Sequence, residues 1–168
     1  MSTLASSKAS HLPVVVSGKY IIPGWVVDHK SFRRWARSDE YPEHGWFSYL
    51  NGKLWVEVEM EKLFTHNLVK TVITGVLFSL VQAKKLGYFF SDRVLLSHSG
   101  VGLSTEPDGT LVFFDTVRSG RVTLVPAKSG DFLELEGTPD MALEVVSDSS
   151  EKKDTEILPE LYWRAGVA

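Results

Sequence analysis

The chain has 168 residues, of which 43% are hydrophobic and 23% charged, so it can build a core, and disorder as its main state is excluded. Eighteen Lys and Arg against 21 Asp and Glu give a net charge of −3, which excludes a broadly basic nucleic-acid-binding surface. Without cysteine, disulfides, thiolate metal sites and a Cys nucleophile are excluded, so a metal site would use carboxylates or histidine.

Residues 1–20 are polar and rich in serine, and we expect a flexible arm there, followed by one domain over residues 21–168. The apolar run Val14 to Val16 is too short for a signal-peptide core, so a cytoplasmic protein is expected. The apolar pattern from Leu68 to Val81 contains Lys70 and several small polar residues, so no segment is expected to enter a membrane.

The first predicted helix begins after Asp28, a helix-capping residue type, and runs through Trp35 and Ala36. Its other face carries the one dense basic cluster of the chain, formed by Lys30, Arg33, Arg34 and Arg37. This cluster is either a solvated helix face, which we favour, or a patch that contacts phosphates.

A hairpin is predicted next, because strand-forming residues 47–50 and 53–58 flank Asn51 and Gly52, the dipeptide typical of a two-residue turn. A long helix is then expected from a cap at Thr65 to a stop at Gly87, packed on a sheet. Short strands are predicted over residues 88–90, 93–97, 111–115, 121–125, 132–136 and 141–146.

A last helix is expected from about residue 151 to Ala165, with a kink at Pro159. This order of elements predicts an α/β (α+β) protein with a mixed sheet. A Gly-rich phosphate loop does not follow any predicted strand, which disfavours nucleotide-binding folds.

The sharpest anomaly in the sequence is Glu144, because it stands in the otherwise apolar run from Met141 to Val146. Burial of an unpaired charge is costly, so Glu144 must take up a proton or find a cation. Side chains alternate along a strand, so Asp140 and Glu144 are expected on one face, where they could share a cation.

Asp108 forms a second acidic candidate, in the stretch Glu106, Pro107, Asp108, Gly109 before a predicted strand. It is either part of an ordinary turn or a partner of Glu144 in holding one divalent ion. Oxygen ligands in a chain without cysteine favour Mg²⁺ or Mn²⁺.

Lys152 and Lys153 begin the last predicted helix after a serine-rich loop, either as surface lysines or as cations close to the two carboxylates. In the second case a lysine would position the attacking water or steady charge on a phosphate oxygen. His66 is more readily interpreted as a local hydrogen-bonding residue than as a ligand.

These motifs resemble the Uma-two family of "putative restriction endonucleases". The resemblance lies in the stretch from Gly137 to Ser150, in Lys153 and Asp154 with the run from Leu161 to Val167, in Asn51 to Leu54, in Thr65 to Asn67, and in Glu106 to Asp108. It covers roughly residues 45–168, and the segments Ser104 to Gly109 and Ser119 to Val122 resemble one branch of the family in particular.

The resemblance implies the restriction-endonuclease-like fold of the PD-(D/E)XK nuclease superfamily, with a mixed central sheet, flanking helices and a hairpin in the N-terminal part. It also implies a magnesium-dependent endonuclease acting on DNA, in which activated water attacks a phosphate. By position, Asp108 and Glu144 resemble the family's two acidic metal ligands, and Glu57 resembles an auxiliary carboxylate for the same metal.

The sequence departs from the family pattern at the lysine that accompanies the two acids. The expected positions carry Val146 and Leu158, so Lys153 or Lys152 would have to substitute by reaching back from the helix. The family continues past the Gly-Val at residues 166–167 into a further strand, so a possible truncation, with a possible homodimer covering the exposed edge, is also expected.

Two alternatives to an active DNA endonuclease remain open from the sequence. The missing lysine and the negative charge suggest a catalytically inactive nuclease-fold module that acts in nucleic-acid binding or assembly. Asp108 and Glu144 could otherwise be the acid and base of a metal-independent hydrolase such as a glycosidase.

Overall fold

The computed structural model describes residues 12–58, 62–128 and 130–167. Its strands are β1 (Val14–Val16), β2 (Tyr20–Ile22), β3 (Trp46–Leu50), β4 (Lys53–Glu57), β5 (Gly87–Ser91), β6 (Leu95–His98), β7 (Leu103–Thr105), β8 (Gly109–Phe113), β9 (Val122–Pro126), β10 (Phe132–Gly137) and β11 (Met141–Leu143). Its helices are α1 (His29–Ala36), α2 (Leu68–Lys84), α3 (Phe114–Arg118) and α4 (Leu158–Ala165), with π-helical turns η1 (Leu63–Asn67) before α2 and η2 (Lys153–Ile157) before α4.

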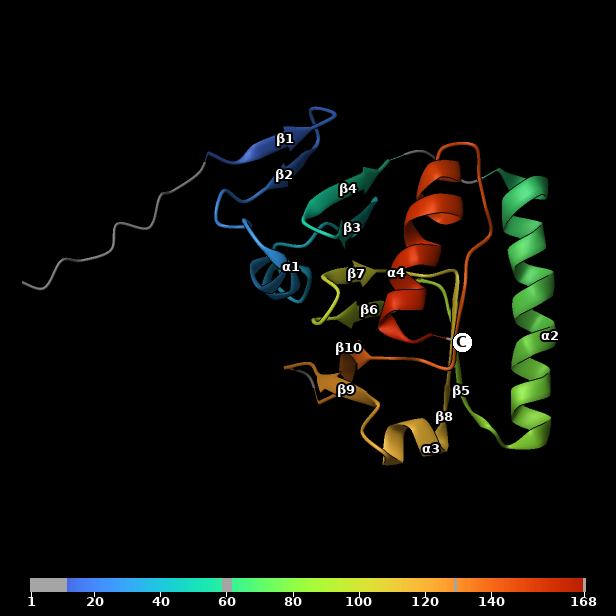
Figure 1. The fold of residues 1–168 in the computed structure, drawn as a ribbon. Helices are drawn as coiled ribbons and strands as arrows, with labels where there is room; N and C mark the ends of the chain where they lie inside the picture. The colour runs from blue at the N-terminus through green and yellow to red at the C-terminus, as the bar shows by residue number, and fades with distance from the viewer. Residues whose placement is uncertain (1–11, 59–61, 129, 168) are drawn as a thin grey trace, which may run out of the picture.

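A six-stranded mixed sheet, in the order β4-β3-β7-β6-β10-β9, forms the centre of the fold (Figure 1). Its β10 and β6 are parallel, and its other neighbours are antiparallel. A second sheet, β11-β8-β5, is antiparallel throughout. The predicted fold class, a mixed sheet flanked by helices, is therefore confirmed.

The hairpin and the first helix form for the reasons that the sequence suggests. Strands β3 and β4 pair in register around Asn51 and Gly52, whose φ angles of 47° and 85° are those of a tight hairpin turn. Asp28 accepts a hydrogen bond from the Ser31 backbone, and the Ser31 hydroxyl closes the capping box at the start of α1.

Two of the four residues in the basic cluster, Arg33 and Arg37, form ion pairs within the protein, while Lys30 and Arg34 are exposed. Arg33 binds Glu136 through both terminal nitrogens, at 2.6 and 2.7 Å, and its Nε lies 2.5 Å from the fully buried Glu134. Arg33 lowers the pKa of Glu136 to about 2 by donating these hydrogen bonds. Arg37 adds a 3.4 Å ion pair to Glu134, so this helix face secures α1 to β10.

The N-terminal part contains an element that the sequence analysis did not predict. Strand β1 pairs with β2, so a second hairpin lies where residues 12–20 were expected to belong to a flexible arm. Apolar alternation in Tyr20 and Ile22, both buried against Phe32, Trp35 and Phe47, explains the hairpin. Residues 1–11 of the expected arm lie outside the described residues.

Helix α2 begins and ends at residues other than those predicted. Thr65 lies inside η1 and is not a cap, and the helix closes on Lys85, which adopts the left-handed conformation with φ 51°. Gly87 instead belongs to β5, where a Cβ atom would lie 2.1 Å from the Val112 carbonyl oxygen. Glycine is needed there because β5 and β8 approach closely.

The segment Leu63–Lys84 is long and apolar enough, by length and composition alone, to cross a membrane, with a mean hydropathy of 1.4. In the structure, 17% of the 18-residue stretch that has this mean hydropathy is buried. Figure 1 shows α2 at the edge of the molecule, with α4 between it and strands β3 and β4. The expectation that no segment enters a membrane stays a prediction.

Helix α4 packs into the main core. Leu158, Leu161 and Tyr162 are buried there with residues of the six-stranded sheet and with Val112 of β8. Pro159 stands in the first turn of α4, where a missing backbone N–H is tolerated, and the wider turn η2 precedes it. The predicted kink at Pro159 stays a prediction, and the structure shows a π-helical turn immediately before α4.

Candidate active site

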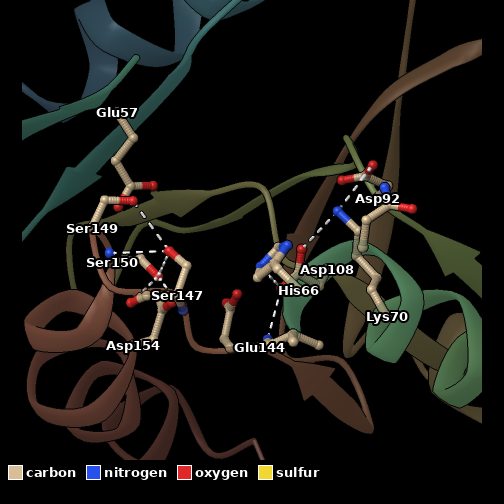
Figure 2. Close-up of polar contacts among 12 residues, drawn as sticks. Glu57, His66, Lys70, Asp92, Asp108, Glu144, Ser147, Ser149, Ser150 and Asp154 are labelled. Carbon is tan, nitrogen blue, oxygen red and sulfur yellow. Dashed lines mark hydrogen bonds and ion pairs between the residues drawn. The ribbon is translucent and has the colours of Figure 1, made fainter. Parts of the chain in front are cut away.

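One pocket, with a volume of about 130 Å³, gathers the chemically distinctive residues from five separate parts of the chain. It is lined by Trp46, Glu57, Lys62, His66, Glu106, Asp108, Glu144, Ser147, Asp148, Ser149, Ser150, Lys153 and Asp154. All four residues predicted to form the site, Glu57, Asp108, Glu144 and Lys153, are among them. Figure 2 shows how the carboxylates from both sides of the pocket face its centre.

Asp108 lies just before β8 and is fixed by contacts from two directions. Its Oδ2 accepts a 2.7 Å hydrogen bond from the backbone N–H of Val145, next to Glu144. Its Oδ1 lies 3.2 Å from the Lys70 ammonium, and the His66 Nε2 lies 3.7 Å from Oδ2 (Figure 2). Asp108 therefore connects helix α2 to the segment that carries Glu144.

Glu144 is not part of a strand, because β11 ends at Leu143, one residue earlier. The predicted strand over residues 141–146 is therefore too long. The backbone leaves the sheet after Leu143, since the Val145 N–H turns to Asp108 instead of to a neighbouring strand. Glu144 accepts a hydrogen bond from the Tyr162 hydroxyl of α4.

Burial raises the pKa of Glu144 to about 8, and the negative charges of Asp154 and Asp108 add to this effect. The hydrogen bond from Tyr162 and the charge of Lys153 oppose the shift without cancelling it. At neutral pH the carboxyl is therefore mostly protonated, even with the Lys153 ammonium nearby, unless a metal ion binds. This result agrees with the expectation that Glu144 must take up a proton or find a cation.

Asp140 does not share the position predicted for it beside Glu144. Its carboxylate accepts hydrogen bonds from the Phe113 N–H, at 2.7 Å, and from the Thr116 hydroxyl, at 2.9 Å, and pairs with Arg121. These contacts tie Asp140 to the start of the short helix α3. The prediction is wrong because the strand does not continue through Glu144, so the alternation of side chains is interrupted.

Lys153 and Glu57 form an ion pair on the other side of the pocket, with 2.7 Å between Nζ and Oε2. Burial alone would lower the pKa of Lys153, but the charges of Glu57 and Asp154 outweigh it and raise this pKa. Asp154 Oδ1 is buried without a hydrogen bond among the described residues, 3.4 Å from the Lys153 ammonium. Lys152, the other candidate, is exposed and does not line the pocket.

Glu106 adds another buried carboxyl to the pocket wall. Burial raises its pKa, while the charge of Arg93 and a 3.2 Å hydrogen bond from the Tyr41 hydroxyl act in the opposite direction. The Ser147 and Ser150 hydroxyls lie 2.8 Å apart and close the loop before the last helical segment. The pocket is thus strongly acidic, with basic groups placed at its sides.

The donor set suits a hard divalent cation, although no three His, Asp or Glu residues of the described chain are grouped as a preformed metal site. Mg²⁺ commonly takes one or two carboxylates and completes its coordination with water and substrate phosphate. Asp108 and Glu144 can supply two such carboxylates, and the second oxygen of Glu144 is not needed for Tyr162. The residues present therefore fit Mg²⁺ or Mn²⁺.

Three residues that shape the site were not singled out from the sequence as site residues. They are Lys70, Asp154 and Tyr162. In the sequence, Lys70 is typical of a solvated lysine, Asp154 of an acidic residue at the start of a helix, and Tyr162 of an aromatic residue in the core. A signal for Lys70 exists, because it follows His66 by four residues and both interrupt the apolar pattern on one helix face. Tyr162 carries no comparable signal, since its partner lies in a distant segment.

Comparisons with known proteins agree with the geometry. The Uma2 family, described as "Putative restriction endonuclease", matches residues 30–168. No curated protein matches the chain. A crystal structure from Anabaena variabilis, of "a putative nuclease belonging to DUF820", has a similar fold with a TM-score of 0.56 and 13% identity, covering 83% of this chain and 67% of that one. The chain therefore belongs to the Uma2 family, the family that its sequence motifs resemble.

Proposed function

We propose that the protein is a cytoplasmic, metal-dependent endonuclease that hydrolyses DNA phosphodiester bonds, with Mg²⁺ or Mn²⁺ held by Asp108 and Glu144. The observation that carries the proposal is the environment of Glu144. A carboxyl with a pKa of about 8, beside a second carboxylate and inside a pocket, gains most from a cation that restores its ionisation.

Each neighbouring residue has a role consistent with this chemistry. Tyr162 orients Glu144, and the Val145 N–H orients Asp108, so both carboxylates hold their positions before any ion arrives. A bound ion would supply an acidified water and neutralise charge on the phosphate. Lys153 is the cation that steadies phosphate charge, and Glu57 is the auxiliary carboxylate that holds Lys153 in place.

We expect DNA to enter this pocket only when a divalent metal ion is bound there. Six acidic side chains line the pocket, from Glu57, Glu106, Asp108, Glu144, Asp148 and Asp154. A phosphate would be repelled from such a wall without a cation. The requirement for a divalent ion therefore follows from the charge of the wall as well as from its chemistry.

The test is cleavage of supercoiled and linear DNA by the full chain with Mg²⁺, Mn²⁺ or chelator. We expect metal-dependent cleavage that falls at least about 100-fold in Glu144→Gln and Asp108→Asn. Asp115→Asn is the matched control, because that exposed carboxylate contacts Arg118 on the surface. Equal cleavage by the wild type and both site variants would refute the proposal.

Metal binding can be measured separately from cleavage. Mg²⁺ should raise the melting temperature of the wild type more at pH 6.5 than that of Glu144→Gln, because Glu144 can give up its proton and bind the ion as a carboxylate, whereas the Gln amide stays uncharged. The proton released on binding is detectable by calorimetry in two buffers of different ionisation enthalpy. A thermal shift that is identical in both proteins would place the ion elsewhere.

A second candidate function is binding of nucleic acid without cleavage. It is favoured by one observation, that Lys153 is already engaged by Glu57 while Leu158 is fully buried and Val146 carries no amine. DNA binding that weakens steeply with salt, together with no metal-dependent cleavage, would support this function. Loss of DNA binding at low salt would exclude it.

A further inference from the structure

Helix α2 leaves most of its apolar side chains in contact with solvent. Val72 and Val76 are 57% and 64% exposed, while Val81 is 1% exposed. Its buried face consists mainly of Lys70, with His66 from the preceding turn, and Val81. A face of this kind is typical of a helix that has a partner outside its own fold.

The exposed face has two parallel features that we name the ridge and the groove. The ridge is a row of large side chains four residues apart, formed by Leu68, Val72, Val76 and Leu80. The groove is a row of small residues with the same spacing, formed by Thr71, Gly75, Ser79 and Ala83, all exposed. Ridges and grooves of equal spacing interlock when two helices pack, so this face is complementary to a copy of itself.

The polar groups of the groove do not require water. The Thr71 hydroxyl donates to the Asn67 carbonyl oxygen at 2.9 Å, and the Ser79 hydroxyl donates to that of Gly75 at 2.8 Å. An ideal Cβ atom at Gly75 would meet nothing within 4 Å, so no part of the described protein fills the space above it. The groove can therefore be buried without leaving the hydroxyl donors of Thr71 and Ser79 unpaired.

We propose that α2 is the interface of a homodimer, in which the α2 helices of two copies pack antiparallel with the ridge of each in the groove of the other. Charge favours this direction. Lys84 and Lys85 lie at the C-terminal end of α2, and Asp148 lies at the other end, paired with Lys62. An antiparallel arrangement brings the lysines near the partner's Asp148 and aligns the helix dipoles favourably, whereas a parallel one opposes like charges.

A membrane is the other candidate occupant of this apolar face, and the structure disfavours it. Lys70 of α2 and His66 lie beside Asp108 in the structure, at 3.2 and 3.7 Å. A bilayer around α2 would surround these groups and the acidic pocket with hydrocarbon, which penalises charge heavily. A protein surface can instead cover the outer face and leave the inner, polar face undisturbed.

The size of the face sets the expected strength of the dimer. A helix of 17 residues is about 26 Å long, so its one face is smaller than the roughly 800 Å² that each partner contributes to a standard interface. The dimer should therefore be reversible. Sedimentation velocity of the full chain from about 1 to about 200 µM should show a concentration-dependent shift from monomer to dimer.

Gly75→Leu is the most informative variant. The added side chain projects into open space in one copy, so the fold should be retained, but it fills the groove that the partner's ridge needs. We expect the dissociation constant to rise at least about tenfold, with the circular dichroism spectrum unchanged. The control is Arg118→Leu, which places the same side chain at an exposed position of α3 and should dimerise like the wild type.

The direction of packing is tested by disulfide formation, since the chain contains no cysteine of its own. In an antiparallel pair, residue 76 lies near the two-fold axis, so Val76→Cys should crosslink with its copy, and Leu68→Cys should not. Crosslinking of both variants would indicate parallel helices and refute the proposed arrangement.

Three further results would overturn the proposal. In the first, the wild type would stay monomeric over the whole concentration range. In the second, Gly75→Leu would dimerise as strongly as the wild type. In the third, the protein would bind vesicles of zwitterionic and anionic lipid, and Gly75→Leu would bind them more tightly. The last result would assign the face to a membrane, because added apolar area strengthens lipid binding and weakens an interlocked helix pair.

Discussion

The turns η1 and η2 line the pocket and lead into helices α2 and α4, and these two helices are attached to the protein by different forces. Helix α4 buries Leu158, Leu161 and Tyr162 in the main core. Helix α2 fully buries one large apolar side chain, Val81, half-buries Ile73 and Leu77, and is also anchored through Lys70. The first attachment depends on hydrophobic burial, and the second depends on less apolar burial together with an ion pair.

The comparison indicates that the two sides of the pocket differ in rigidity. Glu144 is tied to α4 through Tyr162, so its position follows the core. Asp108 has one fixed contact, from the Val145 N–H, and two contacts from the α2 side, so a displacement of α2 would free part of its carboxylate. Changes to α4 should therefore cost stability, and changes to α2 should mainly affect the site and its assembly.

The largest expected effect comes from the same substitution made on each helix. Leu158→Ala removes a fully buried side chain and should lower the free energy of unfolding by about 2 to 5 kcal/mol. Leu68→Ala, at a residue that is 49% exposed, should change it by less than about 1 kcal/mol. Urea denaturation at low protein concentration measures both, and equal losses would remove the contrast between the helices.

The pH dependence of stability should report the α4 side of the pocket. The pKa of Glu144 rises from 4.5 to about 8 in the folded protein, so the folded state holds a proton that the unfolded state has released between these values. Stability is therefore fully present below about pH 4.5 and is lost as the pH rises toward 8, by about 1.4 kcal/mol for each pKa unit.

Glu144→Gln keeps a neutral side chain at every pH and should lose this part of the pH dependence. The stability of the variant relative to the wild type should increase from pH 5 to pH 8. The total increase should be about a few kcal/mol, as the raised pKa of Glu144 implies. Denaturation curves at four pH values measure the difference. Parallel stability profiles for the two proteins would show that the carboxyl is ionised in the folded state.

A smaller effect is expected when the polar anchor of α2 is removed. Lys70→Met leaves Asp108 without its ammonium partner and should lower the free energy of unfolding by about 1 to 3 kcal/mol. Hydrogen exchange should also rise along α2, which would loosen on the body of the protein. Lys84→Met, on the exposed end of the same helix, is the control, and an equal effect of both would deny Lys70 an anchoring role.

The smallest effect sharpens the contrast from the opposite direction. Gly75→Ala replaces a poor helix former at an exposed position with open space above it, so it should stabilise the monomer by up to about 1 kcal/mol. The gain should be seen at protein concentrations where no dimer forms. Destabilisation by this substitution would mean that the position is already packed within one copy.

Much of the fold could be predicted because local signals decide it. The Asn51 and Gly52 turn and the Asp28 cap act within a few residues, so both predictions are confirmed. Strand β7 and helix α3 could not be predicted, because β7 has three residues and α3 is held by contacts with the distant Asp140. The end of β11 was missed for the same reason, since a contact with Asp108 decides it.

For the candidate site, the sequence identified the acids more readily than the residues that hold them. Glu144 stood out because a carboxylate in an apolar run needs compensation, and the structure shows it beside Asp108 in one pocket. Its compensation by Tyr162 and the anchoring of Asp108 by Lys70 depend on tertiary contacts. Those contacts join residues far apart in the chain, which periodicity and composition do not reveal.

The distribution of the pocket along the chain has a consequence for synthesis. Its walls run from Trp46 to Asp154, and Glu144 is oriented by Tyr162 of α4. During translation, a chain that has reached β8 carries Asp108 but neither Glu144 nor its hydroxyl partner. The acidic pair is fully oriented only once α4 has left the ribosome and folded onto the core, so we expect the nascent chain to lack the complete ion site until then.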